Sequence, residues 1–363
     1  MQTGRTEPLV TRHDTDVRFI LASQDPNGAY LASPSFSQYP YCWLRDGSFI
    51  AHAMDVVGQS ASAAAFHTWV ATTLAPLDDH VRSLIRTRDE EGRVDHDRML
   101  PARFRVDGRA ERDGWPDFQL DGYGQWLWSL ERHVWAGGDF DERLRLAAST
   151  VADYLATFWN EPCFDAWEEG RTQHHGSTLA SAAAGLRAAT RLLGASYEPA
   201  ATASWRFVQE RCVMHGHFTK RFANPAVDAS LVWLATPFDL VSDSDETFTK
   251  TLAKIERELI VDGGVHRYLA DTFYGGGAWN LLTAGLAWHH ARSGRQGRAR
   301  ELLAWIESTR ASDGALPEQV PTRRTDRWFH HYWSERWGPS ASPLSWSHAM
   351  VILAKVATET PDS

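Results

Sequence analysis

Residues 39–73, YPYCWLRDGSFIAHAMDVVGQSASAAAFHTWVATT, combine an aromatic and charged segment with two helix-like runs. The runs at 47–57 and 60–73 carry apolar residues at helical spacing, and only Gly58-Gln59 stand between them. So short a connection places two helices side by side and antiparallel. The stretch therefore indicates one structural unit: a long, chemically rich segment, a helix, a tight turn and a second helix.

The same unit recurs along the chain. Further helices are expected at about 12–23, 123–136, 141–158, 178–193, 198–211, 227–235, 247–259, 278–292, 297–309 and 343–357. Other short connections lie near Gly137–Phe140, Gly194–Pro199 and Ser293–Gln296. The long, chemically unusual segments are 39–46, 113–122, 166–176, 215–225, 266–277 and 313–324. If successive helices are antiparallel, all of these long segments emerge at the same end.

With the N-terminal helix as partner of the last one, six helix pairs predict an all-α fold, an (α/α)6 barrel with a single functional rim. No linker or low-complexity stretch interrupts the series, so residues 1–363 are expected to form one domain.

The bulk composition excludes several functional classes. A formal net charge of −9 and a pI near 6.0 argue against a general nucleic-acid or anionic-membrane surface. No apolar run approaches the roughly 20 residues of a membrane span, and residues 1–19 lack the apolar stretch of a secretory signal. The three scattered cysteines form neither a disulfide framework nor a zinc spacing. We expect a cytoplasmic monomer that binds neither nucleic acid nor membrane.

Aromatic residues point to a ligand. The chain has 17 tryptophans, 16 phenylalanines and 9 tyrosines, which a large helical core could also use. Many of the tryptophans, however, stand beside charged or small residues, as in CWLRD, DGWPD, AWEEG and GGAWN. Sugars present both CH faces and hydroxyl edges, so a sugar pocket needs rings and charges together.

Two of the long segments carry glutamates that could perform chemistry. Glu168 and Glu169 follow Trp167 in AWEEG, and Glu318 follows Pro317 in LPEQV. Either pattern alone fits solvated loop acids, but adjacent carboxylates near an apolar ring can have one pKa raised, as a general acid requires. Two glutamates on one rim are what glycoside hydrolysis uses.

These blocks together resemble glycoside hydrolase family 15, the glucoamylase family. The resemblance runs from SPSFSQYPYCWLRDGSF (33–49) through AWEEG, HRYLADTFYGGGAWN (266–280) and LPEQV to SPLSWSHAMVIL (342–353). It implies the six-pair barrel, Glu168 as general acid and Glu318 as the general base that activates water. It also implies inversion, so the two carboxyl groups are expected to stand roughly 6.5–9.5 Å apart.

The resemblance assigns further residues to the first glucose subsite. Arg45 and Asp46 match a rigid pair that grips the sugar hydroxyls, although a structural ion pair at a helix start would look the same. Tyr39 matches a tyrosine beside the base and the catalytic water. Further sugar contacts are expected from Trp43, Trp115, Trp167, Glu169, Arg267, Trp279 and Trp346. In the same rim segment as Trp115, Asp121 could equally cap the following helix.

Several features bear on the substrate. The barrel blocks begin within the first 40 residues and end near the last helix, so neither a β-sandwich nor a starch-binding module is expected. This favours short α-gluco-oligosaccharides over starch, with isomaltose preferred to α-1,4-linked maltose. His174 and His175 lie where contacts to the leaving sugar are expected.

Other readings stay open. Rim histidines would suit a sugar epimerase, and the barrel could be a non-catalytic sugar-binding protein. Histidine pairs such as His215/His217 lack a third ligand at suggestive spacing, and Gly275–Gly277 lacks the residues of a phosphate loop. No metal or other cofactor is expected.

Overall fold

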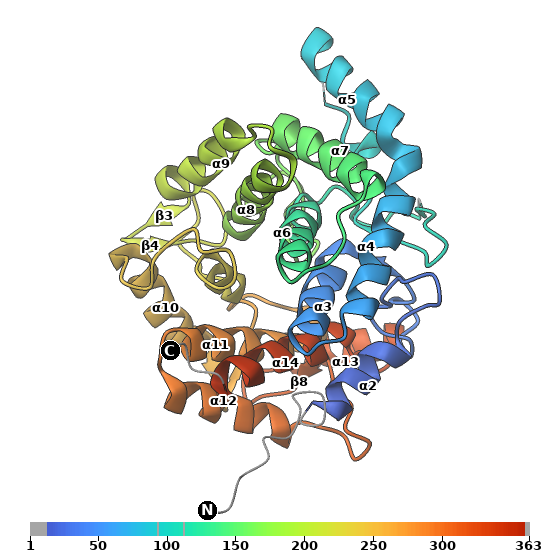
Figure 1. The fold of residues 1–363 in the computed structure, drawn as a ribbon. Coiled ribbons are helices and arrows are strands. Elements are labelled where there is room, and N and C mark those ends of the chain that lie inside the picture. The colour runs from blue at the N-terminus through green and yellow to red at the C-terminus, as the bar shows by residue number, and fades with distance from the viewer. Residues whose placement is uncertain (1–12, 93, 112, 360–363) are drawn as a thin grey trace, which may run out of the picture.

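The computed structural model describes residues 13–92, 94–111 and 113–359. Within them, an inner ring of helical elements is surrounded by an outer layer (Figure 1). The inner elements are α3 (Leu44–Val56), α6 (Asp121–Trp135), α8 (Gly176–Leu193), the 3-10 helix η3 (Ala229–Leu234), α11 (Asn280–Arg292) and α14 (Ser345–Glu359). Their outer partners are α4 (Ser60–Leu74), α7 (Glu142–Phe158), α9 (Glu198–Arg211), α10 (Glu246–Leu259), α12 (Gln296–Ser308) and α2 (Asp14–Ala22). The predicted (α/α)6 barrel is confirmed.

Inner and outer helices differ in how many of their residues are buried. Every residue of α11 from Asn280 to Ala291 is buried, because this inner helix is covered on all sides. The outer helix α10 instead buries one stripe that includes Phe248, Leu252, Ile255 and Leu259, at spacings of four, three and four. This spacing gives an outer helix one apolar face toward the ring and one polar face toward solvent.

Two glycines let neighbouring inner helices touch backbone to backbone. A Cβ atom at Gly124 of α6 would lie 2.2 Å from the carbonyl oxygen of Ser181 of α8. A Cβ atom at Gly185 of α8 would lie 2.5 Å from the Cα atom of Gly124. A side chain at either position would therefore force α6 and α8 apart and open the ring.

The ring is closed by contacts between the two ends of the chain. The last inner helix, α14, packs against both α3 and α2. At its start, the Ser345 amide donates to the carbonyl of Ala32 (2.9 Å) and the Ser345 hydroxyl donates to the carbonyl of Leu31 (2.7 Å). These bonds join the segment before the first inner helix to the start of the last one.

The long segments gather at one end of the ring, as expected. Short two-stranded β-ladders hold several of them in place. β1 (Cys42–Trp43) pairs with β2 (Arg103–Phe104), and β7 (Ala278–Trp279) pairs with β8 (Gln319–Val320). The other ladders are β3 (Val213–Met214) with β4 (His217–Phe218) and β5 (Ile260–Val261) with β6 (Gly264–Val265). Short 3-10 turns complete the elements: η1 (Ala75–Leu77), η2 (His96–Arg98) and η4 (Phe273–Gly275).

Some expected helices were wrong in extent or kind. The run at 227–235 is only a short 3-10 helix, because Pro237 ends a stretch that begins at the N-cap Asp228. α3 begins at Leu44 rather than residue 47, so Arg45 and Asp46 belong to its first turn. Residue 12, the expected start of the first helix, lies outside the described residues, as do residues 1–11 of the segment searched for a secretory signal.

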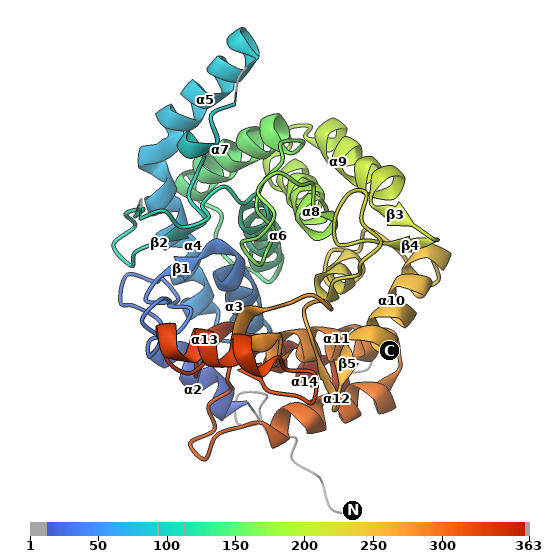
Figure 2. The same ribbon diagram turned by 180° about the vertical axis from the view of Figure 1, so that it is seen from behind.

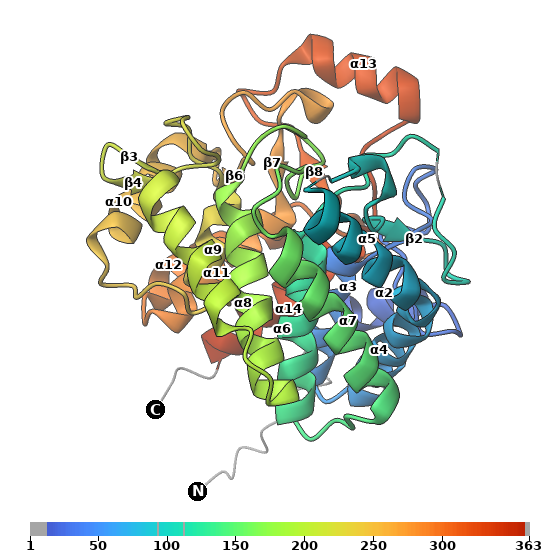
Figure 3. The same ribbon diagram turned by 90° about the horizontal axis from the view of Figure 1, so that it is seen from above.

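Two helices were not expected at all. α5 (Asp78–Glu91) extends away from the ring, and Gly92 ends it in the left-handed conformation (Figure 1). α13 (Arg327–Trp337) lies in front of the ring on the side of the rim (Figure 2) and stands above the ends of the inner helices in Figure 3. Its N-cap Asp326 accepts hydrogen bonds from the amides of Trp328 and Phe329.

Among the helices of the described residues, none has the length and apolar character needed to cross a membrane.

Candidate active site

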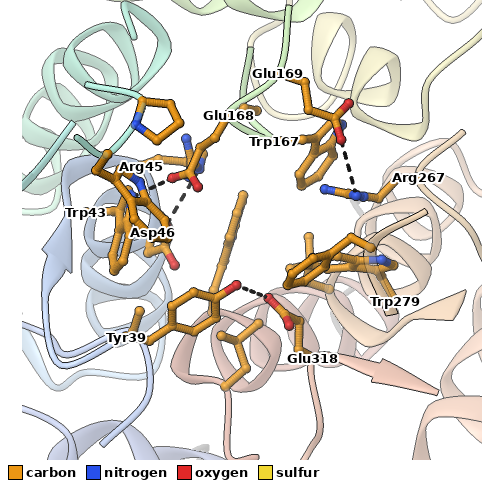
Figure 4. A pocket seen from close by; sticks show the side chains of 18 of the residues that line it. Tyr39, Trp43, Arg45, Asp46, Trp167, Glu168, Glu169, Arg267, Trp279 and Glu318 are labelled. Atoms are coloured by element: carbon orange, nitrogen blue, oxygen red, sulfur yellow. Dashed lines mark hydrogen bonds and ion pairs between the residues drawn. The ribbon is translucent and has the colours of Figure 1, made fainter. Parts of the chain in front are cut away.

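A cavity of about 320 Å³ opens at the rim (Figure 4). The residues expected to be catalytic or to contact the terminal glucose all line it: Tyr39, Trp43, Arg45, Asp46, Trp115, Trp167, Glu168, Glu169, Arg267, Trp279, Glu318 and Trp346. They come from five of the six long segments, from β7 and from the first turns of α3 and α14. The segment 215–225 contributes no residue to the lining.

Glu168 sits in a tight turn that starts at Asp165. Its backbone has a φ of 68°, a conformation that costs a non-glycine residue roughly 1–3 kcal/mol. The Asp165 carboxylate holds the turn, because its Oδ1 accepts from the amides of Trp167 and Glu169 (3.0 Å each). The Asp165 carbonyl also accepts from the amide of Glu168 (2.9 Å).

One oxygen of Glu168 is held by the N-terminal end of α3. The indole Nε1 of Trp43 donates to Oε1 of Glu168 over 2.8 Å. A guanidinium nitrogen of Arg45 stands 3.6 Å from the same oxygen. Among the described residues, no group donates to Oε2.

Arg45 is fixed by a different partner from the one expected. Its Nη1 donates to Oε1 of Gln119 over 2.7 Å. Its Nε forms a longer ion pair with Asp46 (3.6 Å) that is not bidentate. Asp121 lies 3.4 Å from Arg45 and does not cap α6, so it steadies the guanidinium. The Nε atom of Arg45 makes no hydrogen bond within the described residues, and its one ion contact is Asp46.

Glu318 enters the pocket from the opposite wall (Figure 4). It is only 3% exposed, and the amide of Glu318 donates to the carbonyl of Ala341 (2.8 Å). The Tyr39 hydroxyl donates to Oε1 of Glu318 (3.0 Å), and the Ser340 hydroxyl donates to Oε2 (3.3 Å). Both hydroxyls therefore stabilise the ionised carboxylate.

A second guanidinium lies on the third side of the pocket. Arg267 forms a bidentate pair with Asp271 and stands 3.5 Å from Glu169. Glu169 also accepts from the Tyr268 hydroxyl (2.5 Å), and the guanidinium of Arg267 lies 5.0 Å from the ring centre of Trp279. The groups that could bind sugar hydroxyls are thus held in place by the protein itself.

Burial dominates the electrostatics of the pocket. It raises the pKa of Glu318 to about 8, against the opposing effects of Tyr39 and Arg267. It also raises the pKa of Asp46 to about 7, although Arg45 opposes this. Of the adjacent pair Glu168 and Glu169, Glu169 has a pKa raised by burial, which Arg267 opposes.

Two carboxylic acids facing each other across an aromatic cavity, with arginines on the remaining walls, can bind a sugar and cleave it. A model of glycosyl hydrolases family 15 matches residues 17–312. The chain belongs to glycosyl hydrolase family 15.

Known proteins match nearly the whole chain. An isomaltose glucohydrolase of Kribbella flavida is 41% identical over 352 residues, which cover 95% of this chain and 91% of the relative. A glycosidase variant solved in complex with glucose superposes with a TM-score of 0.92 at 39% identity, and the match covers 98% of each chain. The glucoamylase of Saccharomycopsis fibuligera superposes with a TM-score of 0.73 over 98% of this chain and 96% of its own, and at 16% identity this likeness shows the fold alone.

The family 15 site also contains residues that were not expected. Trp333 and Trp337 of α13, together with Phe273, complete the aromatic wall on the side of Trp279. The sequence contains two signals for α13. Asp326 is a capping aspartate before an aromatic run, and Gly338 is a glycine after it.

The histidines lie elsewhere. His174 contacts the carbonyl of Asn160 (2.9 Å) and packs against Phe207, and His175 contacts the carbonyl of Gly170 (3.1 Å). Neither lines the cavity, so its lining does not support the expected contacts to the leaving sugar. No histidine among the described residues lines it.

One group of described residues could in principle hold a metal. Asp55, His67 and His133 bring ligand atoms within 4.8 Å of one another. They lie near the ends of α3 and α6 that are remote from the rim. Nδ1 of His133 is 2.9 Å from Asp55, so this contact already accounts for the buried carboxylate without a cation.

Proposed function

We propose that this family 15 glycoside hydrolase is an inverting, exo-acting α-glucosidase. It would release β-D-glucose from the non-reducing ends of short α-gluco-oligosaccharides, with isomaltose as the preferred substrate. The observation that carries the proposal is the placement of Glu168 and Glu318 on opposite walls of one aromatic cavity. The similarity to an isomaltose glucohydrolase over 95% of the chain supports the choice of substrate.

Glu168 acts as the general acid. Because Trp43 donates to Oε1, the transferable proton resides on Oε2, which faces no donor among the described residues. As the bond between C1 and the glycosidic oxygen breaks, that oxygen takes the proton and the leaving sugar departs as an alcohol. The hydrogen bond from Trp43 keeps the carboxyl group in the orientation that this transfer needs.

Glu318 acts as the general base. A water molecule on its side of the glucose ring attacks C1 while Glu318 takes one of the water protons, and the configuration at C1 inverts. The hydroxyls of Tyr39 and Ser340 hold the carboxylate and stabilise its charge before the proton arrives. Both glutamates return to their starting states when the proton passes from Glu318 to solvent and Glu168 is reprotonated.

The remaining groups bind the terminal glucose. Buried donors that make no hydrogen bond within the described residues are available to sugar hydroxyls: Nε of Arg45 and the indole nitrogens of Trp279 and Trp346. Leaving such a donor unpaired costs roughly 1–3 kcal/mol, which a bound hydroxyl recovers. The aromatic rings of the wall pack against the apolar faces of the sugar.

The size of the cavity supports a short substrate. At about 320 Å³ it lies at the small end of ligand pockets, which run from roughly 300 to 1,000 Å³. α13 adds Trp333 and Trp337 to the lining, so the cavity has an aromatic wall there that limits the space for further sugars.

Proton NMR of the first minutes of reaction tests the proposal. Purified protein is mixed with isomaltose and, in parallel, with maltose, and the anomeric signals are followed before mutarotation. We expect early β-glucose and faster cleavage of isomaltose. Early α-glucose would mean retention and would contradict the roles of both glutamates, and faster cleavage of maltose would change the linkage preference to α-1,4.

The pH dependence of kcat/KM tests the role of Glu318. A base must be ionised, so kcat/KM should rise with pH as Glu318 loses its proton, with an inflection near its pKa of about 8. Tyr39→Phe removes a hydrogen bond that lowers this pKa, so we expect the rising limb to move to higher pH by about one unit. A shift to lower pH, or none, would show that the limb belongs to another group.

Two other activities have less support. A sugar epimerase that uses histidines lacks support, because no histidine among the described residues lines the cavity. A non-catalytic sugar-binding barrel would show no glucose release from any α-glucoside in the NMR experiment.

The proposal includes a single-domain, monomeric enzyme of the cytoplasm. One ring of helices and its loops carries every wall of the cavity, which supports a single domain that acts as a monomer. Cys42, Cys163 and Cys212 are free and buried, which supports a reducing compartment such as the cytoplasm. Light scattering of the purified protein at several concentrations tests the monomer.

A further inference from the structure

Lys220 lies in the rim segment that contributes nothing to the lining of the cavity. It is only 8% exposed, and its ammonium group lies between two buried carboxylates. Nζ donates to Oδ2 of Asp165 (2.7 Å) and to Oδ2 of Asp228 (2.9 Å). Its backbone is fixed as well, because its amide donates to the carbonyl of Ala226 (2.8 Å) and its carbonyl accepts from the amide of Gly176 (3.0 Å).

Both carboxylates accept hydrogen bonds from Trp167, the residue before Glu168. Asp165 binds the backbone amide of Trp167 through Oδ1, and Asp228 accepts from the indole Nε1 of Trp167 (2.8 Å). Asp228 is in turn held by the amide (2.9 Å) and hydroxyl (2.7 Å) of Ser230, at the start of η3. Lys220 therefore contacts both carboxylates that hold Trp167: Asp165 at its backbone amide and Asp228 at its indole. Through Asp228 it is also connected to η3 of the inner ring.

The charge of Lys220 is what keeps this arrangement stable. Two aspartates that share one buried cation would repel each other without it, and one of them would take up a proton. The two aspartates raise the pKa of Lys220 above its ordinary value, although burial opposes this. Three other titratable groups face the cluster. His175 stands 3.7 Å from Asp165, Glu169 stands 3.8 Å from Nζ of Lys220, and the ring centre of Tyr268 lies 3.9 Å from the same Nζ.

The turn that carries Glu168 depends on Asp165. Oδ1 of Asp165 binds the amides on both sides of Glu168, whose own backbone is in the strained left-handed region. Oδ2 of the same carboxylate is the one that binds Lys220. An ion contact on one oxygen thus orients the other oxygen toward the turn.

We propose that Lys220 is a positioning residue for the general acid: its contact with Asp165 and Asp228 holds the turn of residues 165–169 so that Glu168 reaches the glycosidic oxygen. This rests on the proposed function. Lys220 touches neither the sugar nor the reacting atoms and acts through Asp165.

The test compares two substrates that differ in their need for an acid. Isomaltose needs a proton on its leaving oxygen, whereas α-D-glucosyl fluoride loses fluoride, a far weaker base that leaves without full protonation. Lys220→Met keeps the length of the side chain but removes its charge. Because small misplacements of a catalytic group can cost about 10²-fold, we expect kcat for isomaltose to fall by about that factor. The kcat for the fluoride should fall by less than about threefold.

Lys355→Met is the matched control. Lys355 also bridges two carboxylates, Asp16 (3.5 Å) and Glu307 (2.8 Å), but it lies near the end of α14 remote from Trp346 and the cavity. This variant should lower the thermal unfolding midpoint and leave the ratio of the two rates unchanged. The selective loss is expected only at Lys220.

An equal loss on both substrates, or no loss, in folded Lys220→Met would overturn the proposal. If that variant does not fold, Asp165→Asn gives the same test, because Lys220 then keeps Asp228 as its partner and no charge is stranded. We expect Asp165→Asn to show the same selective loss, and an unchanged rate ratio there would also overturn the proposal. Failure of the proposed function is distinguishable, since wild-type protein would then release glucose from neither substrate.

Discussion

Glu168→Gln is expected to lower kcat for isomaltose by about 10²–10⁴-fold, the usual range of a general-acid contribution. Glutamine keeps the size of the side chain, and its amide oxygen can still accept from Trp43, so the pocket should stay intact. The loss should be far smaller with α-D-glucosyl fluoride, whose leaving group needs little protonation. Steady-state rates on both substrates measure the effect.

Glu169→Gln serves as the matched control for the acid. The two residues are adjacent, but Glu169 is occupied by the Tyr268 hydroxyl (2.5 Å) and stands near Arg267 (3.5 Å). Its loss should weaken sugar binding and raise KM for both substrates alike. A larger selective loss on isomaltose in Glu169→Gln than in Glu168→Gln would transfer the acid role to Glu169.

Glu318→Ala is expected to lower kcat by about 10²–10⁴-fold on isomaltose and on the fluoride alike. Water must be activated whichever group leaves, so the two substrates should not differ. The contrast with Glu168→Gln separates base from acid without a structure of either variant. A loss of less than about tenfold would rule out Glu318 as the base.

Ser340→Ala gives a control on the same carboxylate. Its hydroxyl donates to Oε2 of Glu318 over a long 3.3 Å, so its removal should change the rate much less than the loss of Glu318 itself. A loss as large as that of Glu318→Ala would mean that the geometry at Oε2, rather than the base itself, limits the rate.

The layout of the barrel and the lining of its cavity could be predicted because both have local signals. The alternation of short and long connections in the sequence predicts the ring, and each lining residue expected here stands in a short aromatic and charged motif. Arg45 illustrates the limit of this reasoning. Its neighbour in sequence, Asp46, was the expected partner, but the closest acceptor is Gln119, 74 residues away. A linear sequence shows adjacency and not which acceptor the fold brings within 3 Å.

Lys220 and α13 show the same limit from the other side. Lys220 stands in TKRF, and its two partners Asp228 and Asp165 lie 8 and 55 positions away, neither at a spacing that indicates an ion pair. α13 exposes Trp328 and directs Trp333 and Trp337 at the cavity, a pattern with too little apolar periodicity to indicate a core helix. The caps of α13 are visible in the sequence, but its place beside the cavity and the ion contacts of Lys220 are not.

The closure of the ring has a consequence for how the protein acquires its activity. The hydrogen bonds of Ser345 to Leu31 and Ala32 join residues more than 300 positions apart, and Tyr39 meets Glu318 across 279 positions. Contacts of such long range form late, because the entropy of closing the loop is lost before they can stabilise anything. A chain still being synthesised therefore holds an unfinished pocket until its last helix leaves the ribosome. Binding of sugar can then report, in a refolding experiment, the moment when the two ends of the chain meet.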